Sequence, residues 1–190
     1  TVSQVVTASY PTITVSGSQY YSIKVGDPVP NVEATAYDSI IGESYPADLD
    51  ASGIDNQTPG LYIVPIKSVN RYGYIGSMNV YIAVTNVDES IDLAGTYERA
   101  ATGGEANVDE RANGLYEIDN IGGNAGAATH AFFVQIDDST CILPDQPTID
   151  GDMVFTDQRF VFDAAGVLVS YEYKIVLSGY GTALRVFERQ

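Results

Sequence analysis

The stretch that decides the fold runs from Thr58 to Thr85 and reads TPGLYIVPIKSVNRYGYIGSMNVYIAVT. After a Thr-Pro-Gly turn, apolar and polar residues alternate with the two-residue period of a half-buried β-strand. A hairpin connection, Asn70–Tyr74, leads into a second alternating segment. One face of each strand should be buried and the other exposed to solvent, which predicts a strand pair of a β-sandwich. The residues expected on the buried faces are Tyr62, Val64 and Ile66, then Met78, Val80, Ile82 and Val84.

The rest of the chain shows the same short period, and helical periodicity is nearly absent. Turn residues such as Gly26-Asp27-Pro28 separate the segments, and the Gly-rich run Ile121–Ala128 is predicted to be a mobile loop. Hairpin turns are expected at Asp163–Gly166 and Ser178–Gly181. The other predicted strands are Thr12–Val15, Tyr20–Val25, Val32–Tyr37, Ala94–Arg99, Leu115–Ile118, Ala131–Ile136, Cys141–Leu143, Met153–Thr156, Arg159–Phe162, Val167–Leu177 and Ala183–Glu188.

The polar segment Asn86–Asp92 interrupts the strand pattern and predicts a domain boundary within about four residues of Val87. All 6 Phe residues lie beyond it, so we expect a core of Tyr and aliphatic residues before the boundary and of Phe and aliphatic residues after it. The sequence therefore predicts an all-β protein of two domains. Residues 1–87 would form a sandwich, and residues 91–190 an antiparallel meander that closes into a small barrel, lipocalin-like, or a second sandwich.

Composition excludes several classes of protein. Hydrophobic residues make up 45% of the 190 residues, which rules out a disordered chain. The formal net charge of −16 disfavours nucleic acid and anionic lipid surfaces as partners, and it favours a soluble monomer. No apolar run approaches the ~18 residues that span a membrane. The chain opens on Thr-Val-Ser-Gln without an initiator Met, which suggests a form whose targeting segment was removed.

The first half resembles the immunoglobulin-like modules of bacterial surface proteins. The resemblance rests on Val25-Gly26-Asp27-Pro28, Ala34–Asp38, the Thr58–Val64 segment and the Val80–Thr85 strand, and it covers about residues 11–85. It implies a tyrosine corner at Tyr62, whose hydroxyl would bind nearby backbone. The hairpin Asn70–Tyr74 departs from the usual module because it is more aromatic.

Together with the segment Asp92–Arg99, this module is similar to surface lipoproteins of Bacteroidetes that accompany SusC/SusD-type uptake systems. The resemblance implies export to the outer membrane and the cell surface. It also implies a lipid anchor upstream of Thr1, as the chain's only membrane attachment, and an outer-membrane uptake complex as partner.

The predicted ligand-binding residues are Arg71, Tyr72 and Tyr74 at the hairpin tip. Exposed rings stack on sugar faces or peptide side chains, and a guanidinium adds a fork of donors. Gly73 would let the chain turn without burying either ring. The structural alternative is that both rings pack against a neighbouring loop or domain. The absence of Trp, which offers the largest stacking surface, weakens a glycan-binding interpretation.

No sequence motif indicates an enzyme or a cofactor, and none of the known metal-binding motifs is present. His130 is the only histidine, and Cys141 is interpreted as a core residue rather than a nucleophile. Acidic turns could hold calcium at Asp150-Gly151-Asp152 or at Asp88, Glu89 and Asp92, but no known loop spacing is present, and solvated turns are the simpler interpretation.

The functional hypothesis is a non-catalytic surface accessory protein that captures a glycan or peptide nutrient. The alternative is a structural spacer or a protein–protein interaction module.

Overall fold

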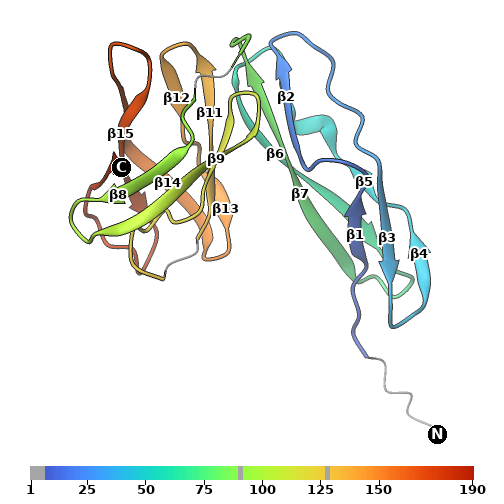
Figure 1. Ribbon diagram of the computed structural model, residues 1–190. Coiled ribbons are helices and arrows are strands. Elements are labelled where there is room, and N and C mark those ends of the chain that lie inside the picture. The colour runs from blue at the N-terminus through green and yellow to red at the C-terminus, as the bar shows by residue number, and fades with distance from the viewer. Residues whose placement is uncertain (1–6, 90–91, 127–128) are drawn as a thin grey trace, which may run out of the picture.

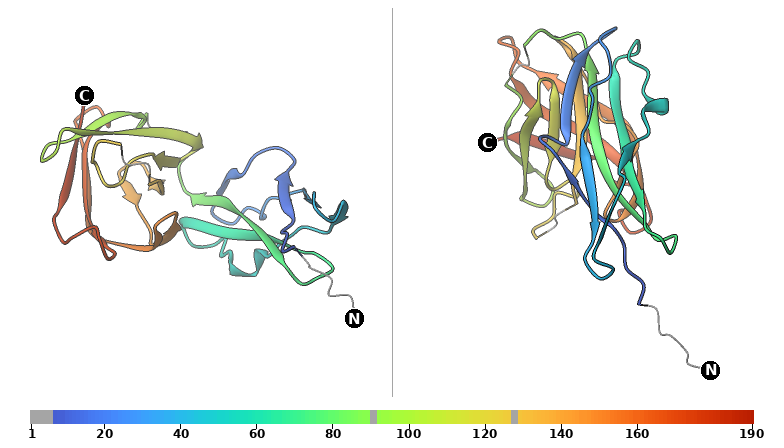
Figure 2. Two further views of the ribbon diagram at one scale, coloured as in Figure 1. Left: turned by 90° about the horizontal axis from the view of Figure 1, so that it is seen from below. Right: turned by 90° about the vertical axis from the view of Figure 1, so that its right-hand side faces the viewer.

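The computed structural model describes residues 7–89, 92–126 and 129–190, and these residues form β-strands joined by turns. Within those ranges the helical structure consists of one short 3-10 turn, η1 (Ala51–Gly53). The all-β prediction is therefore confirmed. The first and second halves of the chain lie side by side, the first in blue to green and the second in yellow-green to red (Figure 1, Figure 2). The described part of the chain contains no helix that is long and apolar enough to cross a membrane.

The first half is a β-sandwich. One sheet has the order β1-β3-β4 and the other β2-β7-β6-β5, with β2 parallel to β7 and the remaining pairs antiparallel. Both sheets contribute to one aliphatic core, in which Ile13 and Ala36 face Val64, Val80 and Ile82. The strands are β1 (Thr12–Val15), β2 (Tyr20–Lys24), β3 (Ala34–Asp38), β4 (Glu43–Tyr45), β5 (Asp48–Leu49), β6 (Gly60–Val69) and β7 (Ile75–Thr85).

A tyrosine corner begins the long hairpin, as predicted. The Tyr62 hydroxyl donates to the backbone oxygen of Thr58 at 2.9 Å. The same arrangement recurs where the second half begins, because the Tyr97 hydroxyl donates to the oxygen of Leu93 at 2.8 Å. Each tyrosine thus anchors the start of its strand to the chain four residues earlier.

The second half is one nine-stranded antiparallel sheet in the order β12-β11-β10-β9-β8-β16-β15-β14-β13. It curls so far that its two edges approach each other (Figure 2). Side-chain amides bridge the edges: Gln146 bonds Phe132, and Gln158 bonds Leu143. The strands are β8 (Gly95–Arg99), β9 (Gly104–Ala112), β10 (Leu115–Ile118), β11 (Ala131–Asp137), β12 (Thr140–Ile142), β13 (Gln146–Thr148), β14 (Gly151–Phe162), β15 (Leu168–Val176) and β16 (Arg185–Arg189).

The sequence predicts tyrosine for the core of the first half, but the structure buries tyrosine in the core of the second half instead. The fully buried tyrosines lie in the second half, where they share the interior of the curled sheet with Phe133 and Phe187. In the first half Tyr21, Tyr45 and Tyr62 are partly buried against an aliphatic core, and no described tyrosine there is fully buried. Aromatic residues are large enough to fill a wide, curled interior, and this explains why they concentrate there. The fully buried tyrosines are Tyr97, Tyr116, Tyr171 and Tyr173.

Two irregularities in β14 and β15 change the predicted strand pattern. The predicted break after Thr156 is a bulge within a single strand, where Asp157 has a φ of 52°. The alternation of Val167–Leu177 predicts that Val169 shares a face with Tyr171 and Tyr173, with Leu168 on the other face. A second shift near Phe162 instead turns Leu168 inward and leaves Val169 exposed. One extra residue on one strand reverses the alternation beyond it.

The Gly-rich run is not simply a surface loop. Ile121, Gly122 and Gly123 are buried against the interior of the curled sheet, and the Tyr173 hydroxyl donates to the oxygen of Ile121 at 2.9 Å. This part of the mobile-loop prediction is wrong because the glycines allow close backbone packing. Residues 127 and 128 of the run lie outside the described residues.

A third apolar cluster joins the two halves. Ala83 of β7 packs with Leu115, Phe132 and Val134 of the second half. The aromatic rings of Tyr81 and Phe132 have centroids 4.0 Å apart. Backbone bonding continues across the junction, since the Asn86 N–H donates to the oxygen of Ile136 at 2.9 Å. The division into two domains near Val87 stays a prediction.

Candidate functional site

The predicted tip residues lie in the turn between β6 and β7. Tyr72 is 50% exposed, and the Arg71 guanidinium lies 5.0 Å from its ring centroid. Arg71 also donates to the Glu43 carboxylate at 2.7 Å and to the Tyr72 hydroxyl at 3.1 Å. Tyr74 is half-buried, and its ring packs edge-on against Tyr10 with centroids 5.4 Å apart. One ring thus faces solvent, and the other packs against a neighbouring segment.

A buried polar hub holds this turn in place. Asp38 accepts hydrogen bonds from the Ser9 hydroxyl at 2.8 Å and from the Asn70 amide at 2.9 Å. The Asn70 side-chain oxygen in turn accepts from the backbone N–H groups of Tyr72 and Tyr74, both at 3.0 Å. Three chain segments that are far apart in the sequence therefore meet at one pair of side chains.

The hub also sets the charge of its carboxylate. Burial alone would raise the pKa of Asp38, but hydrogen bonds from Asn70, Ser9 and the backbone of Ile41 and Ile40 outweigh it and lower that pKa. Asp38 therefore stays ionised at neutral pH, and its carboxylate accepts hydrogen bonds from donors within the fold.

The end of the sandwich around the hub gathers exposed apolar side chains. The β3–β4 and β6–β7 turns lie at the same end of the first half, away from the junction (Figure 1), and most of these residues lie in or directly beside one of the two turns. We call these residues the distal patch. A cluster of exposed large apolar side chains on a soluble protein commonly marks a surface that binds something. The distal patch consists of Tyr10, Tyr37, Ile40, Val69, Tyr72 and Ile75.

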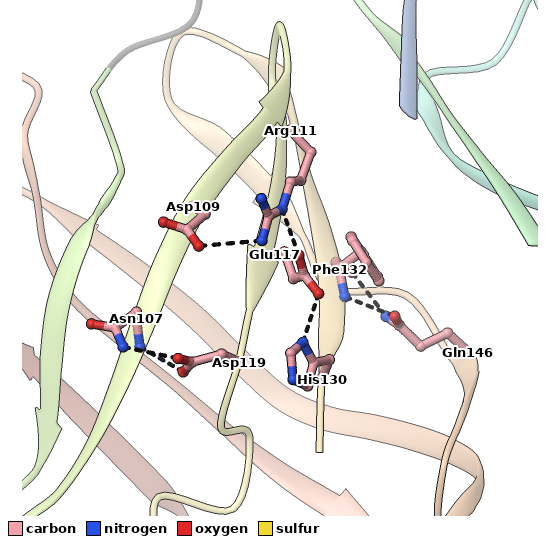
Figure 3. A network of polar contacts seen from close by, with 8 residues as sticks. All are labelled: Asn107, Asp109, Arg111, Glu117, Asp119, His130, Phe132 and Gln146. Carbon is pink, nitrogen blue, oxygen red and sulfur yellow. Dashed lines mark hydrogen bonds and ion pairs between the residues drawn. The ribbon is translucent and has the colours of Figure 1, made fainter. Parts of the chain in front are cut away.

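A second polar network lies beside the junction, on the outer face of β9, β10 and β11 (Figure 3). The buried Glu117 carboxylate accepts from the Arg111 Nε and lies 2.6 Å from His130 Nδ1. Arg111 also reaches Asp109 at 3.3 Å and lies over the ring of Tyr20 of the first half, 5.9 Å from its centroid. This network supports the contact between the halves.

A shallow cavity of about 410 Å³ opens next to this network. Tyr81 and Phe132 line it, His130 stands at its side, and Ile149, which is 86% exposed, lies at its rim. Sequence reasoning missed this cavity because its walls come from three separate segments of the chain. The cavity is the second candidate site.

His130 and Cys141 are not brought together for catalysis. Cys141 is buried in the interior of the curled sheet and pairs with Gln135, near the opposite end of β11 from His130. Burial, followed by the charge of Asp137, raises the pKa of the Cys141 thiol to about 12. The prediction that Cys141 is a core residue agrees with this position.

We expect native Cys141 to react with a disulfide reagent at pH 8 at least about 100-fold more slowly than in urea-unfolded protein. The thiolate is the reactive species, and burial both suppresses it and blocks access. Absorbance of the released thiol measures both rates. Equal rates would show that the thiol is exposed in the folded chain.

Three of the candidate calcium ligands have partners within the protein. Asp150 accepts from the hydroxyls of Thr129 and Tyr180, and Asp88 pairs with Lys24. Asp92 lies 4.0 Å from the Arg189 guanidinium. Within the described ranges, no group of three or more His, Cys, Asp or Glu side chains is arranged to hold a metal ion.

Comparison with known proteins gives limited information. Neither a family profile nor a curated protein sequence matches the chain. A solved structure that it resembles is the lipoprotein BT2262 from Bacteroides thetaiotaomicron, with a TM-score of 0.41 and 17% sequence identity. The alignment covers 95% of this chain and 100% of that chain. At this score the likeness is partial.

Proposed function

We propose that this protein is a non-catalytic, exported binding protein that captures a glycan or peptide at the distal patch. The observation that carries the proposal is the exposed Tyr72 ring beside the Arg71 guanidinium, both placed by the buried Asp38–Asn70 hub. A ring fixed before binding loses little entropy when a ligand stacks on it. The Arg71 donors next to it favour polar or acidic groups on that ligand.

Cell-surface display forms the second part of the proposal. Its support is the resemblance of the Val25–Pro28 and Thr58–Val64 motifs to bacterial surface modules. A lipid anchor upstream of Thr1 would hold the protein on the outer membrane beside an uptake complex. Stacking on each ring contributes roughly 1 kcal/mol beyond its area, so a single contact would be weak. Many copies on one surface would offset that weakness through multivalency.

We expect Tyr72→Ala to weaken ligand binding at least about fivefold while leaving the melting temperature within about 1 °C, because the ring is exposed and its loss leaves no cavity. Glycan and peptide arrays would identify a ligand, and isothermal titration would measure its affinity for each variant.

The matched control is Ile149→Ala, which removes an exposed apolar side chain at the junction cavity. Unchanged affinity in this control supports the distal patch. If Ile149→Ala abolishes binding while Tyr72→Ala does not, the site lies at the junction and the assignment to the distal patch is wrong.

The alternative function is a structural spacer or a protein–protein interaction module. The observation that favours it is the apolar junction, where the Tyr81 and Phe132 rings pack closely and link the halves. A spacer needs such a fixed joint, whereas a capture protein needs a ligand. An absence of binding at millimolar concentration across both arrays would favour the spacer.

A further inference from the structure

Two buried arginines lie on the neighbouring strands β8 and β16, inside the curled sheet. Arg99 on β8 is 8% exposed, and Arg185 on β16 is 3% exposed. Phe187 pairs with Arg99 across the strands and lies two residues from Arg185, so both guanidinium groups project from the same inner face. The two side chains form what we call the arginine pair.

The partners of the arginine pair are neutral. Arg99 Nη1 donates to the oxygen of Gly122 at 2.9 Å and lies 3.4 Å from the side-chain oxygen of Asn124. Arg185 donates to the backbone oxygens of Ala183 and Tyr180. The Nε atom of each guanidinium is buried and has no hydrogen-bond partner in the part of the chain that the structure describes.

No described carboxylate forms an ion pair with either guanidinium, although five of the chain's other basic side chains have one. The undescribed positions 1–6, 90–91 and 127–128 contain no Asp or Glu, so their side chains supply no counter-charge either. In a chain with 25 acidic and 9 basic residues, two buried cations without an acidic partner stand out.

Such an arrangement is costly without an anion. A buried charge normally has an opposite charge beside it, and an arginine side chain stays protonated rather than become neutral. Burial, followed by the positive charge of Arg99, lowers the pKa of Arg185. Each guanidinium therefore raises the electrostatic energy of the other.

Gly122 and Gly123 of the Gly-rich run pack closely against Arg99. Gly123 has a φ of 60°, and a Cβ atom there would lie 2.5 Å from Arg99 Cδ. The Arg185 guanidinium lies over the Tyr180 ring, with its carbon 5.5 Å from the ring centroid. Backbone carbonyls, glycines and aromatic residues thus lie around the pair, and the Nε–H group of each arginine is buried without an acceptor in the described part of the chain.

We propose that the arginine pair binds an oxyanion, either a carboxylate or a phosphate group of a small ligand, inside the curled sheet beside β8 and β16. Both groups match the donor fork of a guanidinium, and charge-assisted bonds to them are among the strongest hydrogen bonds in proteins. The site is separate from the distal patch and does not depend on the function proposed for it.

The test is titration of the intact chain with sodium phosphate and with sodium acetate at constant ionic strength, followed by calorimetry and by the melting temperature. We expect saturable binding of at least one anion and a rise in melting temperature of about 5 °C at saturation. Tighter phosphate binding would indicate a phosphorylated ligand, and tighter acetate binding would indicate an acidic one.

Arg185→Met and Arg99→Met should each weaken anion binding at least about tenfold, because each removes a charge-assisted donor set. Without added anion, Arg185→Met should melt no lower than the wild type, since it removes an uncompensated charge. Exposed Arg159→Met serves as the matched control and should bind like the wild type.

Two results would overturn the proposal. The first is an absence of saturable binding of either anion to the wild-type protein, a measurement that needs no variant to fold. The second is an equal anion response in wild type, Arg185→Met and the conservative Arg185→Lys. Either result would show that the pair only ties loop carbonyls together.

Discussion

Gly76→Ala is expected to destabilise the first half of the chain by about 3 kcal/mol, because the added methyl group meets backbone rather than a movable side chain. A Cβ atom at Gly76 would lie 1.9 Å from the oxygen of Pro11 and 2.9 Å from its carbonyl carbon. Pro11 directly precedes β1, which supplies Ile13 to the core. The start of β1 must therefore move away from β7, and the core between the two sheets opens.

Gly53→Ala is the matched control, because a Cβ atom there meets nothing within 4 Å and the residue has no positive φ. Its effect should stay within about 0.5 kcal/mol. Urea unfolding followed by circular dichroism compares the two variants with the wild type. Similar stability of Gly76→Ala and Gly53→Ala would mean that the chain near Pro11 packs less tightly on β7 than described.

Sequence patterns predicted the strands with strong apolar alternation. The long hairpin of β6 and β7 and the Tyr62 corner lie where the pattern placed them. The strand β9 was missed because its inward residues, Gly104, Ala106 and Val108, are small and its outward residues are polar or acidic. Its strand conformation depends on pairing with β8 and β10 rather than on its own propensity.

The distal end shows what local patterns leave out. Tyr72 is exposed, as expected for a hairpin tip without a core position. The packing of Tyr74 on Tyr10 and the bonding of Asn70 to Ser9 and Asp38 join residues about 30 to 60 positions apart. No local signal marks such contacts, so the hub could not be inferred before the fold was known. The role of Arg71, Tyr72 and Tyr74 in binding remains a prediction.

Gln146→Met is expected to destabilise the curled sheet by about 3 kcal/mol, since it leaves two buried backbone groups without partners. The strand β12 pairs with β11 only from Val134 onward, so the N–H and C=O of Phe132 lie beyond its end. The Gln146 amide takes the place of a β12 residue as their partner. The amide oxygen accepts from Phe132 N at 2.7 Å, and the amide nitrogen donates to Phe132 O at 2.8 Å. The methionine keeps the length of the side chain but none of these bonds.

Gln158→Met is the matched comparison, because Gln158 makes the same pair of bonds to Leu143, at 2.8 and 3.1 Å. Gln146 is only 4% exposed, whereas Gln158 is an exposed residue. Leu143 is buried beneath the exposed Gln158 amide, and water can enter from the solvent side once that amide is removed, so we expect a loss below about 1 kcal/mol in that variant. Urea unfolding of both variants measures the difference. Equal losses would show that closure of the sheet, rather than burial of the unpaired backbone groups, sets the effect of each amide.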